Sequence, residues 1–469
     1  MGEGSIRRLA AAHAAGRVRV RDTVAEALTR AHAAQAASNC FAAIDDAGAM
    51  AAAARIDGEI AAGAAPGPLA GVPVTVKDIL DVAGLPTRWG SPLFSDAAPA
   101  AADIAAVARL RAAGAIVIGK TTTTEFAHSP LGGSPLTGLT LNPFAPHLTC
   151  GGSSSGAGVS AALGVTPVTL ATDAGCSSRL PAAATGTYGF KPTLGLVPHE
   201  RVPDAFGSFI HLGLIARSVA DIAATLEVVA GPEAGDPWSQ RAIPAPAEGA
   251  PLAGRRVLLW MRTRNTCVAP EVEAATREAA RVLESLGATV READYALAPP
   301  DPIWSTLQQT NWAMRFAAAP EAEVARLSPA LKEGIAAARG WSALDLQRAQ
   351  VARTRLFRGV QAEMAQVDFI LTPCVSAPLV AADFDLAGPL TIDGEAVGPL
   401  RAEWTSALSL FDLTGHPAIA VPVGLAANGG PLAVQLVAAW NSDAALLAAA
   451  AAFAAVVPAP ACPGAYPAL

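Results

Sequence analysis

The stretch from Thr149 to Pro192 constrains the fold of this chain more than any other segment. It reads TCGGSSSGAGVSAALGVTPVTLATDAGCSSRLPAAATGTYGFKP. Glycine and serine gather there in two clusters, and such a concentration needs a local backbone reason. Between the clusters, residues 158–163 have a helical pattern and residues 165–171 a strand pattern. The stretch therefore predicts two polar turns that a helix and a strand hold apart, with the second turn at the end of the strand.

The composition favours a large buried core. Of the 469 residues, 52% are hydrophobic and only 16% are charged, which argues against disorder. The formal net charge is −7, and lysine and arginine are scattered along the chain. The sequence therefore disfavours nucleic acid as a partner.

The sequence also disfavours secretion and membrane insertion. Arginines at positions 7, 8, 17, 19 and 21 interrupt the N-terminal apolar pattern, and the Ala-rich segment 444–457 is too short to cross a bilayer. We expect reduced thiols in the cytoplasm and no metal site, because the six cysteines form no CxxC and no Cys/His ligand spacing. These cysteines are Cys40, Cys150, Cys176, Cys267, Cys374 and Cys462.

Residues 71–78 predict a strand that ends in Lys77. Valines at positions 72, 74 and 76 alternate with other side chains, so Lys77 faces away from them at the carboxyl end of the strand. Pro73 places the strand at a sheet edge or marks its first residue. Ligands of α/β proteins gather at the carboxyl ends of strands. From position alone, a solvated lysine at a strand end is the simpler alternative.

Helices alternate with short apolar strands along the rest of the chain. We expect helices within 5–35 (interrupted at Gly16), at 46–62, 101–113, 217–230 and 271–286, over most of 303–367, and before Val457. We expect strands at 115–119, 256–260, 288–292, 369–373, 418–423 and 432–437. Residues 126–147 and 192–209 are expected to be loops, and 242–250 a Pro/Ala linker. This alternation predicts an α/β sheet.

Three separated motifs resemble the amidase signature family. They are VTVKD at 74–78, GGSSSG at 151–156 and TDAGCSSRLP at 172–181, the last followed by GFKP at 189–192. Shorter matches are Asn142-Pro143, GHPA at 415–418 and GPLAVQ at 430–435. Each motif alone is weak, whereas the combination is specific and spans essentially the whole chain. We predict a large mixed, mainly parallel central sheet covered by helices on both sides. We also predict one domain over 1–469, with a catalytic region at about 65–235 and a substrate-shaping helical insertion at 300–367.

The resemblance implies an acyl-transfer enzyme with a Ser–Ser–Lys triad. Ser177 falls at the nucleophile, Ser153 at the bridging serine and Lys77 at the general base, with a cis peptide bond between Gly152 and Ser153. A serine hydroxyl needs an adjacent base, and lysine can act as one only when burial lowers its pKa. The bridging hydroxyl can relay the proton because it donates and accepts at once. Asp78 would oppose the lowered pKa if its carboxylate lay near Lys77.

The turn around the nucleophile is expected to bind the oxyanion. Its donors would be the backbone N–H groups of Ala174, Gly175, Cys176 and Ser177. Asp173 and Arg179 are expected to form a structural ion pair that supports this turn.

By the same resemblance, the loop after Phe126 lines the acyl pocket. His128, Ser129 and Ser154 are the candidate substrate contacts, although a loop histidine without a role is the alternative for His128. Three tryptophans are candidate pocket walls, with core packing as the alternative for each: Trp304, Trp312 and Trp404.

Two residues depart from the family pattern. Cys176 stands where the family usually has glycine before the nucleophile, and a Cβ there would disfavour a positive φ and narrow the oxyanion turn. Cys176 is disfavoured as the nucleophile itself, because no adjacent histidine or cation stabilises a thiolate. Ser155 replaces a second usual glycine and adds a hydroxyl near the relay.

Other Gly/Ser-rich sites fit less well. No Gly-Lys-Ser/Thr ends the loop, which excludes a Walker A motif, and no GxGxxG motif follows a strand with a suitably spaced acidic residue. The serine at 177 does not lie in a GxSxG elbow, which disfavours a standard α/β-hydrolase.

The predicted function is hydrolysis of a carboxamide through an acyl-enzyme on Ser177, with release of ammonia or an amine and with no metal or organic cofactor. The expected partner is a small-molecule amide, without nucleic acid or membrane, and the chain is a candidate homodimer. One alternative is the amidase subunit of a tRNA-dependent amidotransferase. The other, suggested by Cys176, is a non-catalytic scaffold that retains the fold.

Overall fold

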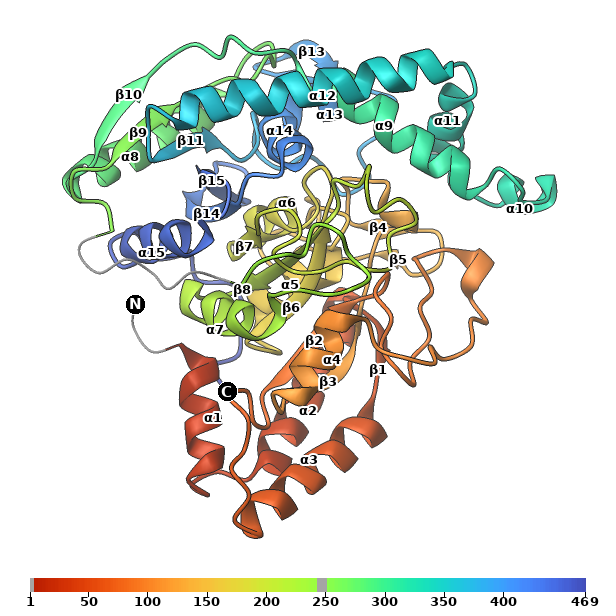
Figure 1. Ribbon diagram of the computed structural model, residues 1–469, viewed down its shortest axis with the longest axis vertical. Coiled ribbons are helices and arrows are strands. Elements are labelled where there is room, and N and C mark those ends of the chain that lie inside the picture. The colour runs from red at the N-terminus through yellow and green to blue at the C-terminus, as the bar shows by residue number, and fades with distance from the viewer. Residues whose placement is uncertain (1–3, 243–250) are drawn as a thin grey trace.

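The computed structural model describes residues 4–242 and 251–469, and one large sheet runs through its centre (Figure 1). In chain order its strands are β1 (Phe41–Ile44), β2 (Pro73–Lys77), β3 (Ile116–Thr121), β6 (Val168–Asp173), β7 (Tyr188–Lys191), β8 (His211–Ala216), β9 (Arg256–Leu259), β10 (Thr289–Glu292), β11 (Phe369–Pro373), β14 (Ala418–Leu425) and β15 (Pro431–Ala438). Their spatial order is β1-β3-β2-β6-β8-β7-β14-β15-β11-β9-β10. Two small two-stranded sheets lie outside it, formed by β4 (Gly133–Ser134) with β5 (Gly138–Leu139) and by β12 (Pro389–Ile392) with β13 (Glu395–Pro399).

The strand directions make this a mixed sheet. Pairing is parallel within β3-β2-β6 and within β11-β9-β10, and β9 and β10 are joined by a helix as expected. The pairs between these two groups are antiparallel. The large mixed α/β sheet is confirmed, but parallel pairing is confined to the two groups rather than prevailing throughout. The β14–β15 pair is antiparallel because only a short turn joins these two strands, and a short turn permits antiparallel pairing alone.

Helices cover both faces of the sheet, as expected (Figure 1). The apolar core under one face includes side chains of α1 (Ser5–Ala14), α4 (Ala105–Ala112), α7 (Val219–Val229), α8 (Pro270–Ser285) and α15 (Asp443–Ala454). Separate apolar clusters contain side chains of α2 (Val20–Ser38), α3 (Asp46–Ala61), α5 (Ser155–Leu163), α9 (Pro300–Arg315), α11 (Pro329–Ala338), α12 (Ala343–Met364) and α14 (Ser406–Thr414). The shorter helices are α6 (Arg179–Ala184), α10 (Glu321–Ala325) and α13 (Leu400–Trp404). No helix within the described ranges has the length and hydropathy needed to cross a bilayer.

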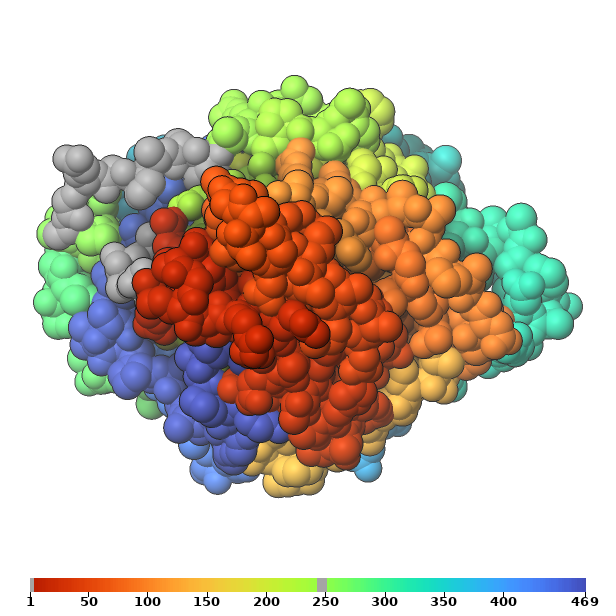
Figure 2. Space-filling model, turned by 90° about the horizontal axis from the view of Figure 1, so that it is seen from below, coloured from red at the N-terminus to blue at the C-terminus, as the bar shows by residue number. Residues whose placement is uncertain are grey.

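The two ends of the chain meet at one end of the molecule. Seen from below, the red N-terminal elements lie beside the blue C-terminal part (Figure 2). Arg30 on α2 donates a hydrogen bond to the carbonyl oxygen of Pro467 at 2.7 Å. The backbone N–H of Tyr466 donates to the carbonyl oxygen of Leu163 at 2.8 Å. The last residues are thereby attached to α2 and α5.

Most of the expected elements are present, with differences at the boundaries. Three strands were not expected from the sequence: β1, β7 and β8. β7 ends just before the expected loop at 192–209, and β8 begins just after it. Of the expected Pro/Ala linker at 242–250, residues 243–250 lie outside the described residues. Pro73 is the first residue of β2, which lies between β3 and β6, so the proline marks a strand start rather than a sheet edge.

Candidate active site

The carboxyl ends of β2 and β6 meet at the same edge of the sheet, because the two strands are parallel neighbours. Lys77 is the last residue of β2, and its side chain is fully buried. Its ammonium nitrogen, Nζ, lies 2.7 Å from Ser153 Oγ and 2.9 Å from Thr172 Oγ1. Thr172 was not assigned a role from the sequence. Thr172 lies at the carboxyl end of β6, the parallel neighbour of β2, and that position could have indicated from the sequence that it lies near Lys77.

Asp78 does not pair with Lys77. Its carboxylate forms a buried ion pair with Lys120, whose Nζ lies 3.0 Å from Asp78 Oδ1, and it also accepts the backbone N–H of Arg88. Lys120 neutralises the Asp78 carboxylate, so Asp78 does not stabilise the charged form of Lys77 as it would if the two were paired.

Burial lowers the pKa of Lys77 to about 7, although the negative charge of Asp173 and the Cys176 thiol act in the opposite direction. Desolvation disfavours the charged ammonium, and the two hydroxyl partners of Lys77 carry no charge to compensate. A substantial fraction of neutral amine is thus present near neutral pH. A neutral amine can accept a proton, which is what a general base requires.

Ser153 lies in a tight turn before α5. The peptide bond between Gly152 and Ser153 is cis. A Cβ on Gly152 would come within 2.5 Å of the Leu131 carbonyl oxygen, so the loop of residues 129–131 packs directly on this turn. The Ser153 carbonyl accepts the N–H of Thr124 at 3.2 Å, and the next residue, Ser154, donates its N–H to the Ser177 carbonyl at 3.2 Å. The two Gly/Ser turns are therefore hydrogen-bonded to each other.

Ser177 follows β6 in the second turn and is 9% exposed. The Asp173 carboxylate accepts the N–H of Ser177 at 2.6 Å and the hydroxyl of Ser178 at 2.8 Å. The Ser177 N–H is thus already engaged, in contrast to its expected place among the oxyanion donors. The N–H groups of Gly175 and Cys176 have no acceptor within the part of the chain that the structure describes.

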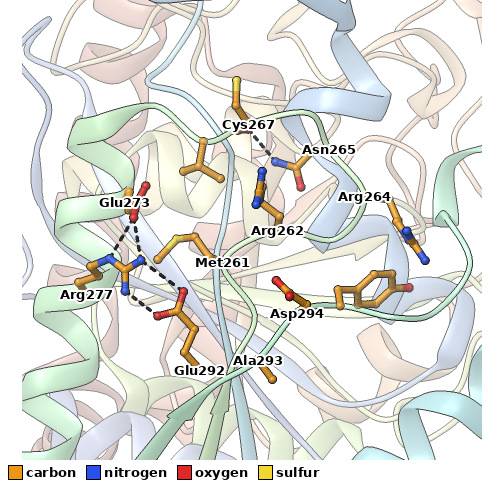
Figure 3. Close-up of a pocket in the computed structure, with 12 residues that line it drawn as sticks. Met261, Arg262, Arg264, Asn265, Cys267, Glu273, Arg277, Glu292, Ala293 and Asp294 are labelled. Carbon is orange, nitrogen blue, oxygen red and sulfur yellow. Dashed lines mark hydrogen bonds and ion pairs between the residues drawn. The ribbon is translucent and has the colours of Figure 1, made fainter.

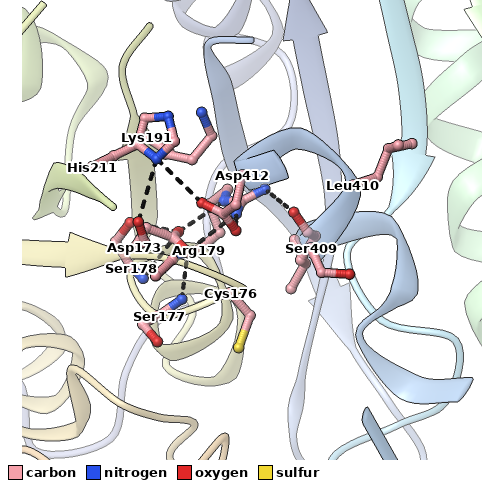
Figure 4. Close-up of polar contacts among 12 residues, drawn as sticks. Asp173, Cys176, Ser177, Ser178, Arg179, Lys191, His211, Ser409, Leu410 and Asp412 are labelled. Atoms are coloured by element: carbon pink, nitrogen blue, oxygen red, sulfur yellow. Dashed lines mark hydrogen bonds and ion pairs between the residues drawn. The ribbon is translucent and has the colours of Figure 1, made fainter. Parts of the chain in front are cut away.

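A buried polar network lies behind this turn (Figure 4). Arg179 donates from Nε to Asp173 at 2.8 Å and from Nη2 to Asp412 on α14, and all three side chains are fully buried. Its Nη1 donates to Gln435 Oε1 at 2.6 Å and to the Leu408 carbonyl at 2.9 Å. Burial alone would raise the pKa of Asp173, but the Arg179 guanidinium and the hydrogen bonds from Ser178 hold it well below its usual range.

Cys176 fits the turn without a positive φ. Its side chain is 1% exposed and packs in an apolar cluster with Leu131, Leu180 and Ala183. Burial raises the pKa of the Cys176 thiol to about 11, so a thiolate is scarce at neutral pH. Cys176 was expected to narrow the oxyanion turn if the turn required a positive φ at this position. The turn does not require one, so this effect is absent.

A cavity of about 180 Å³ opens onto Ser177, Ser153 and Thr172. Its apolar walls include the aromatic side chains of Trp89, Phe126, Trp304 and Trp312. Trp304 also donates from Nε1 to the Ala174 carbonyl at 2.6 Å, and a Cβ on Gly175 would come within 2.8 Å of the same nitrogen. Trp304 and Trp312 are thus pocket walls and core residues at once. Trp404 lies in another apolar cluster and donates to Ala377.

The three expected substrate contacts do not line this cavity. His128 and Ser129 line a neighbouring hollow, and His128 Nδ1 lies 2.7 Å from the Glu125 carbonyl oxygen. The loop places Phe126 and Ala127 against the cavity instead. Ser154 is fully buried, and its hydroxyl donates to the Thr172 carbonyl at 3.3 Å.

A second cavity, of about 610 Å³, lies elsewhere, beyond the carboxyl ends of β9 and β10 (Figure 3). Arg277 on its wall is held by Glu273 and Glu292. None of its lining residues is a serine or lysine, so it does not offer the chemistry of the Ser177 cavity. Residues 4–242 and 251–469 contain no cluster of three or more His, Cys, Asp or Glu side chains placed to hold a metal ion.

The chain is similar in sequence to a known protein family. The family model described as Amidase matches residues 22–447. The chain belongs to the amidase family. Among curated amidases, it is 32% identical to an acylamidase of Rhodococcus erythropolis, covering 84% of this chain and 82% of the relative. It is 35% identical to an indoleacetamide hydrolase of Bradyrhizobium diazoefficiens, covering 84% and 75%.

Solved amidase structures share the fold over the whole chain. A bacterial aryl acylamidase of the amidase signature family superposes with a TM-score of 0.89 at 26% identity, covering 98% of both chains. The peptide amidase of Stenotrophomonas maltophilia superposes with a TM-score of 0.82 at 25% identity, again covering 98% of both chains. The resemblance inferred from the motifs is thereby confirmed, and the amidase is a hydrolase that acts on amide C–N bonds.

Proposed function

We propose that this amidase cleaves a carboxamide through an acyl-enzyme on Ser177, with Ser153 as the proton relay and Lys77 as the general base. The observation that carries the proposal is the 2.7 Å hydrogen bond between Lys77 Nζ and Ser153 Oγ in a site that excludes water from the lysine. The hydrogen bond between Ser154 and the Ser177 carbonyl holds the relay beside the nucleophile.

The reaction then has two halves. Ser177 Oγ attacks the amide carbonyl carbon while its proton passes to Ser153 Oγ and the Ser153 proton passes to Lys77. The tetrahedral intermediate collapses when the C–N bond breaks, and the proton returns by the same path to the leaving nitrogen, which departs as ammonia or an amine. Water attacks the acyl carbonyl in the second half, its proton taken up by the same base, and the carboxylic acid product leaves Ser177 free.

The oxyanion donors in this proposal are the backbone N–H groups of Ala174, Gly175 and Cys176. We omit the Ser177 N–H from the expected set because Asp173 accepts it. One donor of this kind is worth about 3 kcal/mol in the barrier. The Trp304 hydrogen bond to the Ala174 carbonyl supports the direction of the same turn.

We further propose a small-molecule amide with an aromatic or apolar segment as substrate. The aromatic cavity walls support this class, and the names of an aryl acylamidase and an indoleacetamide hydrolase among the relatives agree with it. We retain the proposal of one domain over 1–469, with a catalytic region at about 65–235 and a substrate-shaping segment at 300–367. Trp304, Gln308 and Arg315 of that segment line the cavity.

We also retain the cytoplasm as the proposed location, a homodimer as the proposed assembly, and function without nucleic acid or membrane. The unpaired state of the cysteines supports a reducing compartment. Size-exclusion chromatography with light scattering tests the assembly directly.

A fluorophosphonate probe should label Ser177 and no other residue. The probe mimics the acyl donor and reacts with a serine hydroxyl only where a base and an oxyanion site activate it. Intact-mass measurement and peptide mapping should give a single adduct. The matched control is Cys176→Ala, which removes the neighbouring thiol and should keep the adduct. A folded protein without an adduct, or an adduct on Cys176, would refute the proposed chemistry.

The pH profile should report Lys77. The base works only when deprotonated, so kcat/KM for an uncharged amide should rise about tenfold per pH unit below pH 7 and level off above it. Lys191 offers a matched control, because it is also fully buried with a pKa lowered to about 7 by burial, yet it donates to the His416 carbonyl instead of a serine. Lys191→Met should leave the inflection in place. An inflection lost with Lys191→Met would contradict the role of Lys77.

A further inference from the structure

One face of α9 forms a wall of the Ser177 cavity. Trp304, Gln308, Asn311 and Arg315 all line the cavity, and their spacing of four, three and four positions places them on one side of the helix. Trp304 contacts the oxyanion turn through its hydrogen bond to the Ala174 carbonyl. The helix therefore runs away from the oxyanion turn between Trp304 and Arg315.

Arg315 lies at the far end of this wall, and its guanidinium is available to bind a ligand. The side chain is exposed, and the centre of its guanidinium lies 4.2 Å from the Trp89 ring centroid and 4.9 Å from that of Phe126. Within residues 4–242 and 251–469 it has no hydrogen-bond acceptor and no carboxylate partner. Stacking on two rings holds the guanidinium plane in place while its N–H groups stay free for a planar anion.

The other charges of the cavity are already engaged. Arg201 lies 3.8 Å from the Glu200 carboxylate, and Arg401 donates to the His128 carbonyl at 3.0 Å and stacks on Trp304. The single carboxylate of the lining, Asp204, accepts the N–H of Gly207. With three arginines and one carboxylate in its lining, the cavity is cationic in a chain whose net charge is −7. That local excess of positive charge favours an anionic ligand.

Gln308, between Trp304 and Arg315 on this wall, has a side-chain carbonyl oxygen without a hydrogen-bond partner in the described structure. Its side chain is 8% exposed, and its Oε1 is buried without a hydrogen-bond partner in the described structure. A buried carboxamide without a partner costs free energy, and a ligand that hydrogen-bonds to it recovers that cost. The position lies one helical turn from Trp304, and therefore close to the reacting amide.

We infer that the substrate is an elongated amide whose far end carries a carboxylate, which Arg315 binds. This inference rests on the proposed amidase function and names its substrate class. The rise of 1.5 Å per residue separates the α-carbons of Trp304 and Arg315 by about 16 Å. Side chains lean toward the N-terminus of a helix, so the guanidinium lies closer to the oxyanion turn than its α-carbon does. A small aliphatic amide cannot span that distance, whereas an aryl amide with a distal carboxylate can fill the aromatic section and reach the arginine.

Three biphenyl-4-ylacetamides test the inference, bearing a carboxylate, a methyl group or a trimethylammonium group at the far 4′ position. The wild-type enzyme should hydrolyse the carboxylate with a kcat/KM about tenfold or more above the methyl compound, the size expected of a bidentate charge-assisted pair. The trimethylammonium compound should be the slowest of the three. The preference should shrink as salt is added, because exposed charges are screened.

Variants then assign the preference to one residue. Arg315→Gln should lower kcat/KM for the carboxylate about tenfold, mainly through KM, and affect the methyl compound much less. Arg315→Lys should keep part of the preference, since it retains the charge but not the planar fork. The matched control is Arg281→Gln, a remote exposed arginine on α8 that should change neither substrate.

The outcomes separate this inference from the proposed function. Equal rates for the carboxylate and methyl compounds, or an equal loss for both in Arg315→Gln, would overturn the carboxylate subsite while leaving amide hydrolysis intact. Hydrolysis of none of the three compounds, together with no fluorophosphonate adduct, would overturn the proposed function itself.

Discussion

Replacing Ser177 by alanine is expected to lower kcat by about 10⁶-fold, which in practice means to the limit of detection. The substitution removes the oxygen that forms the acyl-enzyme, and no other group on the described cavity wall has a base hydrogen-bonded through a relay. The turn itself should keep its shape, because Asp173 holds the backbone N–H of residue 177 rather than its hydroxyl. Release of ammonia or amine from a neutral aryl amide is the measurement.

Ser155→Ala is the matched control for this loss. Ser155 is also buried near the relay, but its hydroxyl donates to the Thr122 carbonyl at 3.4 Å and does not line the cavity. Turnover in this variant should stay within about tenfold of wild type, a change of about 1.4 kcal/mol in the barrier. Turnover of Ser177→Ala above one part in a thousand, with the folded protein verified, would rule out Ser177 as the nucleophile.

Lys77→Ala should lower kcat by about 10³-fold, within the range that a general base contributes. Without the amine, the Ser153 hydroxyl has no group to which it can pass the proton from Ser177. The truncation also leaves a cavity beside Ser153 and Thr172, so a small alkylamine such as ethylamine should restore part of the rate. Steady-state turnover with increasing amine concentration measures this rescue.

Lys77→Met separates loss of the base from loss of packing. Methionine fills much of the same volume, so this variant should be as inactive as Lys77→Ala but should not respond to added amine. Both variants should remain folded, because a lysine with a lowered pKa contributes no buried charge that the fold needs near neutral pH. Near-normal turnover in either variant would refute the assignment of the base.

Local patterns were enough to predict the amidase family, because the residues that carry the resemblance lie in short motifs. Lys77 ends an alternating strand, and the two Gly/Ser turns flank one helix and one strand, so their proximity follows from parallel pairing of β2 with β6. The α/β class followed from the same alternation of helices and strands.

Long-range partners left no such signal. Lys120 neutralises Asp78, and Asp412 and Gln435 hold Arg179, yet the local pattern around each of these residues does not indicate its distant partner. The antiparallel middle of the sheet was missed for a related reason. β7 and β8 are short and contain glycine, and their strand character depends on burial between other strands rather than on their own alternation.

The expected substrate contacts lie outside the cavity lining for a different reason. The loop after Phe126 does reach the cavity, but its direction turns so that Phe126 and Ala127 face the cavity while His128 faces a neighbouring hollow. Both Phe126 and Ala127 have positive φ values, 46° and 58°, which no residue preference would suggest. A change of chain direction at non-glycine residues is set by packing and is invisible in the sequence.

The network around Arg179 has a consequence for how the protein becomes active during synthesis. Lys77, Ser153 and Ser177 have all been translated by residue 177, but the acceptors that orient Arg179, and through it Asp173, come from Leu408, Asp412 and Gln435. A nascent chain therefore carries the three proposed triad residues before it contains the acceptors that orient Arg179. We therefore expect amide hydrolysis to begin only after residue 435 has left the ribosome.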